Sequence, residues 1–535
     1  MTPFMGRSFG ALFALALAAP GLFAPGLARA AIDRPVKLDA GLIAGAASPR
    51  DPSISVFRGV PFAAPPVGDL RWRAPRPAAT WQGVRAARQF APSCQQQVSD
   101  KGFGPWTAEY VVHGAVSEDC LYLNIWKPAA ASGRLPVMVW IHGGGFSAGS
   151  GSVPIYEGAA LARRGIIVVT INYRLGLYGF LAHPGLASEN PDHATGNYGL
   201  FDQIAALRWV HDNIAAFGGD PARVTVAGQS AGAASVHDLI ASPLAQGLFA
   251  RAIAESGSGM GIPLPDRAAA EKTGLALQQA AGAADIAGLR ALTPAQLDAA
   301  VAKLAPSRPG GLMFAPDVDG RVIPAASYVG ANTHDVPVLT GVAAQEMIGL
   351  DPRYGHATPT SFTSQVKQRY GAFAPQILSH YPAADDAAAN RAVDDLARDR
   401  ELAATYFWAR NRLGESRQPI YLYLWTHIEP GPDAARYKAF HSSEIPYVFG
   451  TLDAAQRPYA TVDRAIEKLM GDYWANWVKT GNPNGAGLPA WPQLDTATPR
   501  MLTIGDQARA QPVLSADTMA LFDSYVRSGG TVSLF

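Results

Sequence analysis

The sequence predicts an α/β fold, in which helices flank a central, mostly parallel β-sheet. Two short apolar runs rich in β-branched residues, 135–141 and 166–171, are typical of strands buried on both faces. Between 200 and 217, apolar residues recur at steps of three and four, as they do on one face of a helix. A further apolar run, 224–227, predicts another buried strand, and the order strand, helix, strand is the βαβ unit of an α/β sheet.

The residues between these elements agree with that order. Gly218 and Gly219 are expected to end the helix, and the Asp-Pro pair that follows them to form a turn. Further along, the apolar runs 336–339 and 420–424 predict later strands of the same sheet. Ala-rich helices are expected at 265–281 and 294–304.

Length and composition favour a large, well-packed protein. The chain has 535 residues, of which 48% are hydrophobic and 16% charged, so it can bury a substantial core. It has no internal repeat and no low-complexity linker. The Pro/Gly-rich segments 61–77 and 306–311 are interpreted as surface loops, so residues 31–535 are expected to form a single domain.

Charge excludes two classes of partner. Lys and Arg total 44 against 43 for Asp and Glu, a net charge of +1, and no long run carries one sign. Proteins that bind nucleic acid or an anionic membrane surface usually concentrate positive charge. We therefore expect neither partner.

The first 30 residues have the pattern of a secretory signal peptide. Arg7 precedes an apolar stretch, 9–19, and a small-residue cleavage site follows at Ala30. The alternative is an uncleaved membrane anchor, but the apolar stretch is shorter than the roughly 20 residues that a spanning helix needs. The mature protein is therefore expected to be exported, periplasmic or secreted, and free of the membrane.

Cys94 and Cys120 are the only cysteines, and both lie in the part of the chain that would be exported. In an oxidising compartment they are expected to form a disulfide, which would stabilise the fold by roughly 3 to 4 kcal/mol. The alternative is a pair of inert buried thiols. The two cysteines lack the close CxxC spacing of zinc sites, so no metal site is expected.

A candidate nucleophile follows the strand at 224–227. The segment 228–232 reads Gly-Gln-Ser-Ala-Gly, a GxSxG motif, and a plausible helix start follows it. Strand, sharp turn and helix are the context of a nucleophile elbow, which would expose the Ser230 hydroxyl above the sheet. The amide of Ala231 would then point toward a developing oxyanion. The alternative is a simple glycine turn.

A second glycine motif supplies candidate oxyanion donors. The segment 142–146, His-Gly-Gly-Gly-Phe, comes directly after the strand at 135–141. Consecutive glycines leave backbone amides uncovered, and losing one oxyanion donor typically costs about 10² to 10³ in turnover. A phosphate-binding loop is the alternative, but the segment has neither the Lys-Ser/Thr ending of a P-loop nor the GxGxxG spacing.

With these motifs, the chain resembles the type-B carboxylesterases, the bacterial relatives of the cholinesterases. The resemblance runs through most of the mature chain. Its landmarks, besides the two glycine motifs, are 57–63 (FRGVPFA), 71–72 (RW), 117–124 (SEDCLYLN), 172–174 (NYR), 196–203 (GNYGLFDQ), 217–221 (FGGDP), 255–258 (ESGS) and 444–450 (EIPYVFG).

The resemblance implies an α/β-hydrolase fold whose large insertions form a gorge-like pocket. It also implies a catalytic set in the chain order Ser, Glu, His, and an oxyanion hole from two loop glycines and the residue after the serine. By position these are Ser230, Glu346 and His441, with Gly144, Gly145 and Ala231. Cys94 and Cys120 match the family's first disulfide, which closes a loop over the pocket, and Ser256 matches a serine that supports the acid.

The base must be chosen from eleven histidines. His441 follows the serine and the candidate acid in α/β-hydrolase order, and it lies four residues after Tyr437 in an expected strand-end loop. His142 precedes the nucleophile and lies inside the oxyanion loop, where a positioning role is simpler. His237 lies two helical turns after Ser230 and is expected to pack.

More than one residue could be the acid of the catalytic set. Glu346 follows the strand at 336–339, where the family places its acid. However, the family usually has Asn at the position of Ala343, and Gly at the position of Met347. Asp317 and Asp319 are alternatives by chain order, although their segment is more simply interpreted as a turn.

These residues predict hydrolysis of a small-molecule carboxylic ester through an acyl-enzyme, with no metal or organic cofactor. Because His441 must be neutral to accept a proton, activity should rise through about pH 6 to 7. A non-catalytic, cholinesterase-like binding protein and an acyltransferase with the same triad remain the alternatives, and the sequence makes no prediction of oligomeric state.

Aromatic residues suggest the substrate class. They predict an apolar or aromatic pocket for small to medium esters. The residues are Phe103, Trp106, Tyr110, Phe146 and Phe314.

Overall fold

The computed structural model describes residues 1–2, 34–99, 101–131, 133–190, 194–259, 264–304, 314–324 and 334–534. Apart from its first two residues, the predicted signal peptide lies outside the described residues, as does the predicted loop 306–311. Within the described ranges, no helix has both the length and the apolar character needed to cross a bilayer.

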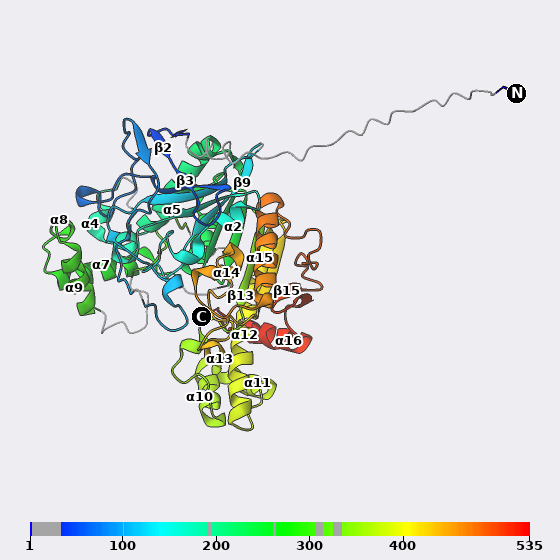
Figure 1. Ribbon diagram of the computed structural model, residues 1–535. Helices are drawn as coiled ribbons and strands as arrows, with labels where there is room; N and C mark the ends of the chain where they lie inside the picture. Colours follow the sequence, from blue (N-terminus) through cyan, green and yellow to red (C-terminus); the bar gives the residue numbers. More distant parts are fainter. Residues whose placement is uncertain are drawn as a thin grey trace.

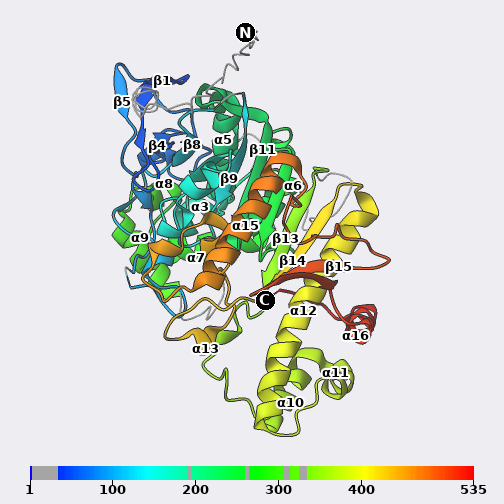
Figure 2. The same cartoon turned by 45° about the vertical axis from the view of Figure 1, so that its right-hand side comes forward.

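An eleven-stranded sheet forms the centre of the molecule, in the order β16-β15-β14-β13-β12-β11-β9-β10-β8-β4-β3 (Figure 2). From β10 to β15 every neighbouring pair is parallel, whereas the pairs at both edges are antiparallel. The strands are β3 (Ala46–Ala47), β4 (Ile54–Pro61), β8 (Tyr122–Pro128), β9 (Leu135–Ile141), β10 (Ile167–Ile171), β11 (Gly219–Gln229), β12 (Arg251–Glu255), β13 (Val338–Ala343), β14 (Ile420–Trp425), β15 (Arg500–Ile504) and β16 (Ala508–Pro512).

Two small sheets lie outside the central one. They consist of β1 (Val36–Lys37), β2 (Leu42–Ala44) and β5 (Val84–Ala86), and of β6 (Ser93–Cys94) and β7 (Val116–Ser117). The helices are α2 (Ala159–Ala162), α3 (Gly176–Phe180), α4 (Pro184–Ala187), α5 (Tyr198–Asn213), α6 (Ala231–Ala241), α7 (Arg267–Ala281), α8 (Ile286–Arg290), α9 (Pro294–Leu304), α10 (Pro359–Tyr370), α11 (Ala374–His380), α12 (Asp386–Glu415), α13 (Ala434–Tyr437), α14 (Ile445–Phe449), α15 (Thr461–Thr480) and α16 (Ala516–Arg527).

Helices bury both faces of the sheet. Successive side chains of a strand point to opposite faces, so each central strand contributes to the packing on both. Trp140 of β9 packs in the apolar cluster that contains Trp474 of α15. Val139, one residue earlier, packs in the cluster that contains Leu207 of α5. Helices α2 and α15 therefore cover one face and α5 and α6 the other, which explains why β9 is a continuous apolar run.

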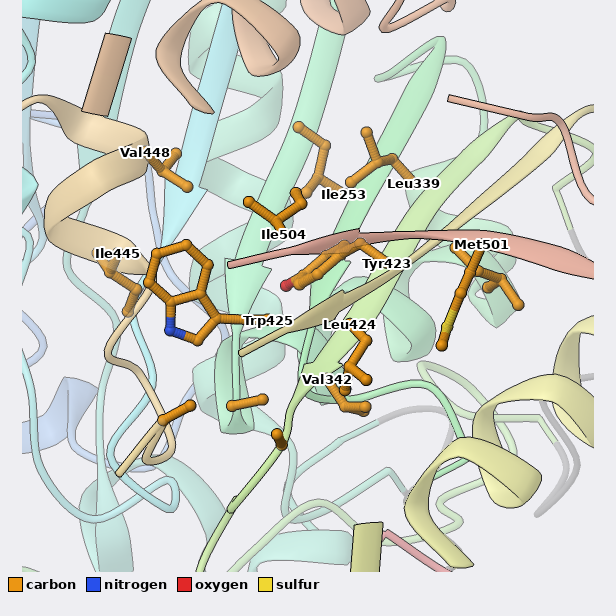
Figure 3. Packing of buried hydrophobic residues seen from close by; sticks show 14 of the residues in the cluster. Ile253, Leu339, Val342, Tyr423, Leu424, Trp425, Ile445, Val448, Met501 and Ile504 are labelled. Carbon is orange, nitrogen blue, oxygen red and sulfur yellow. The ribbon is translucent and has the colours of Figure 1, made fainter. Parts of the chain in front are cut away.

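Packing beside β14 carries the core toward the C-terminal part of the chain. Figure 3 shows the indole of Trp425 beside Ile445 of α14, with Val448 one turn further along that helix. The Trp425 ring lies 5.0 Å from the ring of Tyr447 between centroids. This contact holds α14, and the connection that precedes it, against the carboxyl end of β14.

Helices α10 to α12 form a projection from the main body. In Figure 1, α12 extends away from the sheet, and α10 and α11 pack together at its far end. The other end of α12 contacts β13 and β14, so the projection is continuous with the core.

Most predicted elements are present with small shifts at their ends. The strand predicted at 336–339 runs from Val338 to Ala343, because Pro337 has no amide proton to donate to a neighbouring strand. The strand predicted at 224–227 begins earlier, at Gly219, and its pairing with β9 shifts register between Gly219 and Val224. Gly218 ends the preceding helical segment with a φ of 83°, as its predicted helix-stop role requires.

Candidate active site

Ser230 occupies a strained turn between β11 and α6. Its φ is 59° and its ψ −125°, a conformation that side chains rarely adopt, and its amide donates to the Glu255 oxygen across 2.9 Å. A Cβ added at Gly228 would lie 2.5 Å from the carbonyl carbon of Gly232, and one added at Gly232 would lie 2.1 Å from the Ile141 oxygen. Both motif positions therefore require glycine, as a nucleophile elbow does.

The glycine loop 142–146 lies beside this turn because β9 and β11 are parallel neighbours. Ile141 pairs with Gly228, so the two strands end side by side. A Cβ added at Gly143 would lie 3.0 Å from the Ser230 Cβ, which shows how closely the loop approaches the serine.

Gly144, Gly145 and Ala231, whose backbone N–H groups are the predicted oxyanion donors, line the same cavity as Ser230. Within the part of the chain that the structure describes, none of these N–H groups donates to a backbone oxygen. Gly144 has a φ of 106°, and a Cβ there would lie 2.2 Å from the Ala148 oxygen, so the loop conformation depends on glycine. The arrangement provides donors for an oxygen that gains negative charge next to Ser230.

Glu346 and His441 are hydrogen-bonded through Glu346 Oε2 and His441 Nδ1, and both side chains are buried. The other oxygen, Oε1, accepts from the Ala343 amide across 2.8 Å, and the His441 amide donates to the Glu346 backbone oxygen across 2.9 Å. Glu346 follows β13, and His441 lies between α13 and α14. A bridge between Gln345 and Phe440 joins these two segments, so the backbone fixes the orientation of the pair.

The second ring nitrogen of His441 lies next to the elbow. Because Nδ1 faces a carboxylate, it carries the proton, and Nε2 is left as an acceptor. Gln229, the residue before Ser230, places its side-chain Nε2 3.1 Å from His441 Nε2. Gln229 is not predicted as a site residue from the sequence, where its only signal is its place in the GxSxG motif.

The rival histidines are engaged elsewhere. Burial lowers the pKa of His142 to about 4, and its ring stacks on Tyr173 with centroids 4.5 Å apart. Burial likewise lowers the pKa of His237 to about 3, and its Nε2 lies 2.8 Å from the Ser258 hydroxyl. Both therefore stay neutral and packed at ordinary pH.

The alternative acids also have other surroundings. Asp319 Oδ1 accepts from the amides of residues 321–323, as expected of a turn. Asp317 is buried against Asn197. The Asn197 side chain donates to the backbone oxygen of Asp317 and accepts from the amide of Asp317. Burial, reinforced by the charge of Asp319, raises the pKa of Asp317 to about 8. Among the described residues, neither aspartate lines the cavity of Ser230.

Ser256 is buried at the end of β12, with a φ of 52°. Its amide donates to the Gly341 oxygen across 2.8 Å. Its hydroxyl makes no hydrogen bond within the described ranges, so the support for the acid that the family resemblance implies is not observed as a direct bond.

Ser230 and His441 line one cavity of about 560 Å³. Of the aromatic residues predicted for the pocket, four line it, namely Phe103, Trp106, Tyr110 and Phe146. The prediction for Phe314 is wrong, because that side chain is buried in the core cluster on the α5 side of the sheet. Two further lining residues are not predicted from the sequence: Tyr156 of the short helix η3 (Pro154–Tyr156) and Val153, which precedes that helix.

Cys94 and Cys120 form the predicted disulfide. The loop that it closes supplies one wall of the cavity, including Phe103 and Trp106. The loop is also held by an ion pair, in which Arg457 donates to Glu109 across 2.7 Å. The described residues of the disulfide loop thus form one wall of the site.

Comparisons with known proteins show which sequences and structures this chain is similar to. Residues 33–522 match the Carboxylesterase family. The chain is 37% identical over 484 residues to fumonisin B1 esterase of Sphingopyxis macrogoltabida, covering 86% of this chain and 85% of that protein. It is 36% identical over 470 residues to phenmedipham hydrolase of Pseudarthrobacter oxydans, covering 84% and 92%. A solved structure of PNB esterase matches with a TM-score of 0.75 and 30% identity, covering 91% and 99%.

Proposed function

Because the chain belongs to the carboxylesterase family, with its α/β-hydrolase fold and carboxylic-ester hydrolase activity, we propose that it acts through an acyl-enzyme formed on Ser230. One observation carries this proposal: Ser230, in its strained turn, and His441, which is hydrogen-bonded to the buried Glu346, line a single cavity. A nucleophile, a base and an orienting acid are the parts that acyl transfer needs.

In the proposed mechanism, His441 Nε2 takes the proton from Ser230 Oγ as that oxygen bonds to the ester carbonyl carbon. The carbonyl oxygen becomes an oxyanion, which accepts hydrogen bonds from the amides of Gly144, Gly145 and Ala231. Collapse of this intermediate breaks the bond to the alcohol, which leaves with the proton from His441. Water then repeats both steps and releases the acid, while Glu346 stabilises the imidazolium in each half-reaction.

The cavity favours uncharged esters with apolar or aromatic groups. Among the described residues that line it, there is no Asp, Glu, Lys or Arg. Its tyrosines stay neutral, because burial raises the pKa of Tyr110 and of Tyr156 above the usual range. A charged substrate would lose its hydration without gaining a partner, so we propose small to medium apolar or aromatic esters as substrates.

Hydrolysis of p-nitrophenyl butyrate by wild-type and Ser230→Ala protein tests the mechanism. The variant should fold and lose nearly all activity, and retention of more than about 10⁻² of wild-type turnover would contradict the assignment. Ser188→Ala, which alters an exposed serine, is the control. A fluorophosphonate probe should label Ser230 alone, which also separates an esterase from a non-catalytic binding protein. Product analysis in the presence of an added alcohol tests acyl transfer.

We also propose that the protein is exported and that residues 31–535 form one domain. The disulfide supports export, because such bonds persist in oxidising compartments. A single sheet that takes strands from Ala46 to Pro512 supports the one domain. Mass spectrometry of the protein recovered from the periplasm or medium should find Ala31 at its N-terminus, whereas an intact N-terminus would contradict cleavage.

A further inference from the structure

Exposed apolar side chains gather where the cavity of Ser230 opens. Val98, Phe103 and Met347 are 43%, 66% and 38% exposed, and all three line that cavity. We call these three residues the apolar mouth. Two come from the disulfide loop, and Met347 comes directly after Glu346 on the opposite segment.

Phe103 is held in place although it is exposed. Its amide donates to the Trp106 oxygen across 2.9 Å, and the Trp106 amide donates back across 3.1 Å. The two rings lie 4.9 Å apart between centroids. A Cβ added at Gly102 would lie 1.9 Å from the Trp106 oxygen, so the turn depends on glycine at that position. These contacts hold the backbone of the turn, from which the Phe103 ring is exposed to solvent.

Met347 is fixed from the other side. Its backbone follows the acid that binds His441, and its oxygen accepts from the Leu350 amide across 3.0 Å at the short helix η7 (Ile348–Leu350). The mouth thus consists of two ordered segments, one of which also carries Glu346. Its position relative to Ser230 is set by the same backbone that sets the site.

The apolar mouth lies between the rest of the cavity and solvent. Its three residues line the cavity of Ser230 and are partly exposed, so an ester chain that extends from Ser230 to the opening meets them. The described lining has no charged residue that would favour a charged chain end. Covering apolar surface that is otherwise exposed to water is favourable, and each methylene removed from water is worth about fourfold in an equilibrium.

We infer that the apolar mouth is a subsite for the distal part of an apolar ester chain that extends from Ser230 to the opening of the cavity. The inference rests on the proposed function and extends it to long-chain esters. The chain belongs to either the acyl or the alcohol group, and these two sources are separated by experiment.

The test compares kcat/KM for p-nitrophenyl acetate and p-nitrophenyl dodecanoate, with the long ester kept below its aggregation concentration. In Phe103→Ser/Met347→Ser protein, the dodecanoate-to-acetate ratio should fall about tenfold relative to wild type. A second series with acetate esters of ethanol and dodecanol tests the alcohol side. A fall in either series supports the subsite and assigns the chain. An unchanged ratio in both overturns it.

A matched control removes exposed apolar side chains elsewhere. Leu275 on α7 and Val526 on α16 are 48% and 37% exposed and do not line the described cavity. Leu275→Ser/Val526→Ser should leave the ratio unchanged, and an equal fall there would overturn the inference. If the double variant misfolds, Phe103→Gln alone replaces it in the test. This single variant should lower the dodecanoate-to-acetate ratio severalfold. If wild-type protein showed no p-nitrophenyl acetate hydrolysis that depends on Ser230, the proposed function itself would be refuted.

Discussion

The indole Nε1 of Trp106 donates to the backbone oxygen of His441 across 3.1 Å, and it lies 3.3 Å from the Ser442 hydroxyl. The two rings meet edge to face, with centroids 6.3 Å apart. A residue of the disulfide loop therefore holds the segment that carries the proposed base. The loop that forms one wall of the cavity also fixes the position of His441.

Replacing Trp106 with Phe should lower kcat about fivefold and change KM little. The aromatic wall remains, but a hydrogen bond worth about 1 kcal/mol is lost, and His441 is held less firmly. Trp106→Ala should raise KM as well, because it also removes the wall. Steady-state kinetics on p-nitrophenyl butyrate measure both constants. Wild-type kcat in Trp106→Phe, with a loss only in Trp106→Ala, would mean that Trp106 acts only through packing.

Gln229 should affect the pH dependence of the reaction. Its amide lies 3.1 Å from His441 Nε2, so a carboxylate in its place would favour the protonated imidazole. Since only the neutral ring can accept the proton, Gln229→Glu should move the acid limb of kcat/KM to higher pH. Gln229→Leu removes the polar contact without adding charge and should not move the limb upward. Identical limbs in the Glu and Leu variants would contradict this interpretation.

The sequence predicts those features of the site that are local. The GxSxG motif carries its own context, because the strand before it and the tight approach of Gly228 and Gly232 follow from neighbouring residues. The long-range contacts are different. Nothing in the sequence places the Gln229 side chain at His441 or the Trp106 indole at the His441 oxygen, since each depends on how distant loops pack.

The same limit explains the pocket. Phe103 and Phe314 are both predicted to line the pocket, and only the folded chain shows that Phe103 lines the cavity while Phe314 packs in the core cluster on the α5 side of the sheet. The predicted strand ends differ from the observed ones by a few residues. The later start of β13 follows from Pro337, which is visible in the sequence. The early start of β11 at Gly219 depends on its pairing with Leu135, which is not.

Glu346 and Asp317 make contrasting predictions as candidate acids. Glu346→Gln keeps the shape of the side chain but can no longer stabilise the imidazolium, so kcat should fall by about 10³ to 10⁴. Asp317→Asn should turn over at nearly the wild-type rate, because His441 Nδ1 is bonded to Glu346, whereas the backbone of Asp317 is bonded to Asn197. Circular dichroism of both variants checks that they fold. Normal turnover in Glu346→Gln would require another acid.

Glu255 should make the stability of the protein depend on pH. Its side chain is fully buried, its Oε1 accepts from the Trp474 indole across 2.7 Å, and its Oε2 has no hydrogen-bond partner among the described residues. Burial raises its pKa from 4.5 to about 8. The pKa of nearby Glu444 is also raised well above its usual value, first by burial and then by repulsion from Glu255. The folded protein therefore keeps a proton on Glu255 that the unfolded chain releases at neutral pH.

The sign of the effect follows from that difference. A raised carboxyl pKa favours the folded state fully below about pH 4.5, and the benefit is lost as the pH rises through about 8. The free energy of unfolding in urea should thus decline from pH 5 to pH 8. In Glu255→Gln the decline should be shallower, because glutamine still accepts from Trp474 but has no proton to release. Glu415→Gln, at an exposed position on α12, should keep the wild-type slope. If Glu255→Gln lost stability as steeply as wild type over this range, Glu255 would not hold its proton in the folded protein.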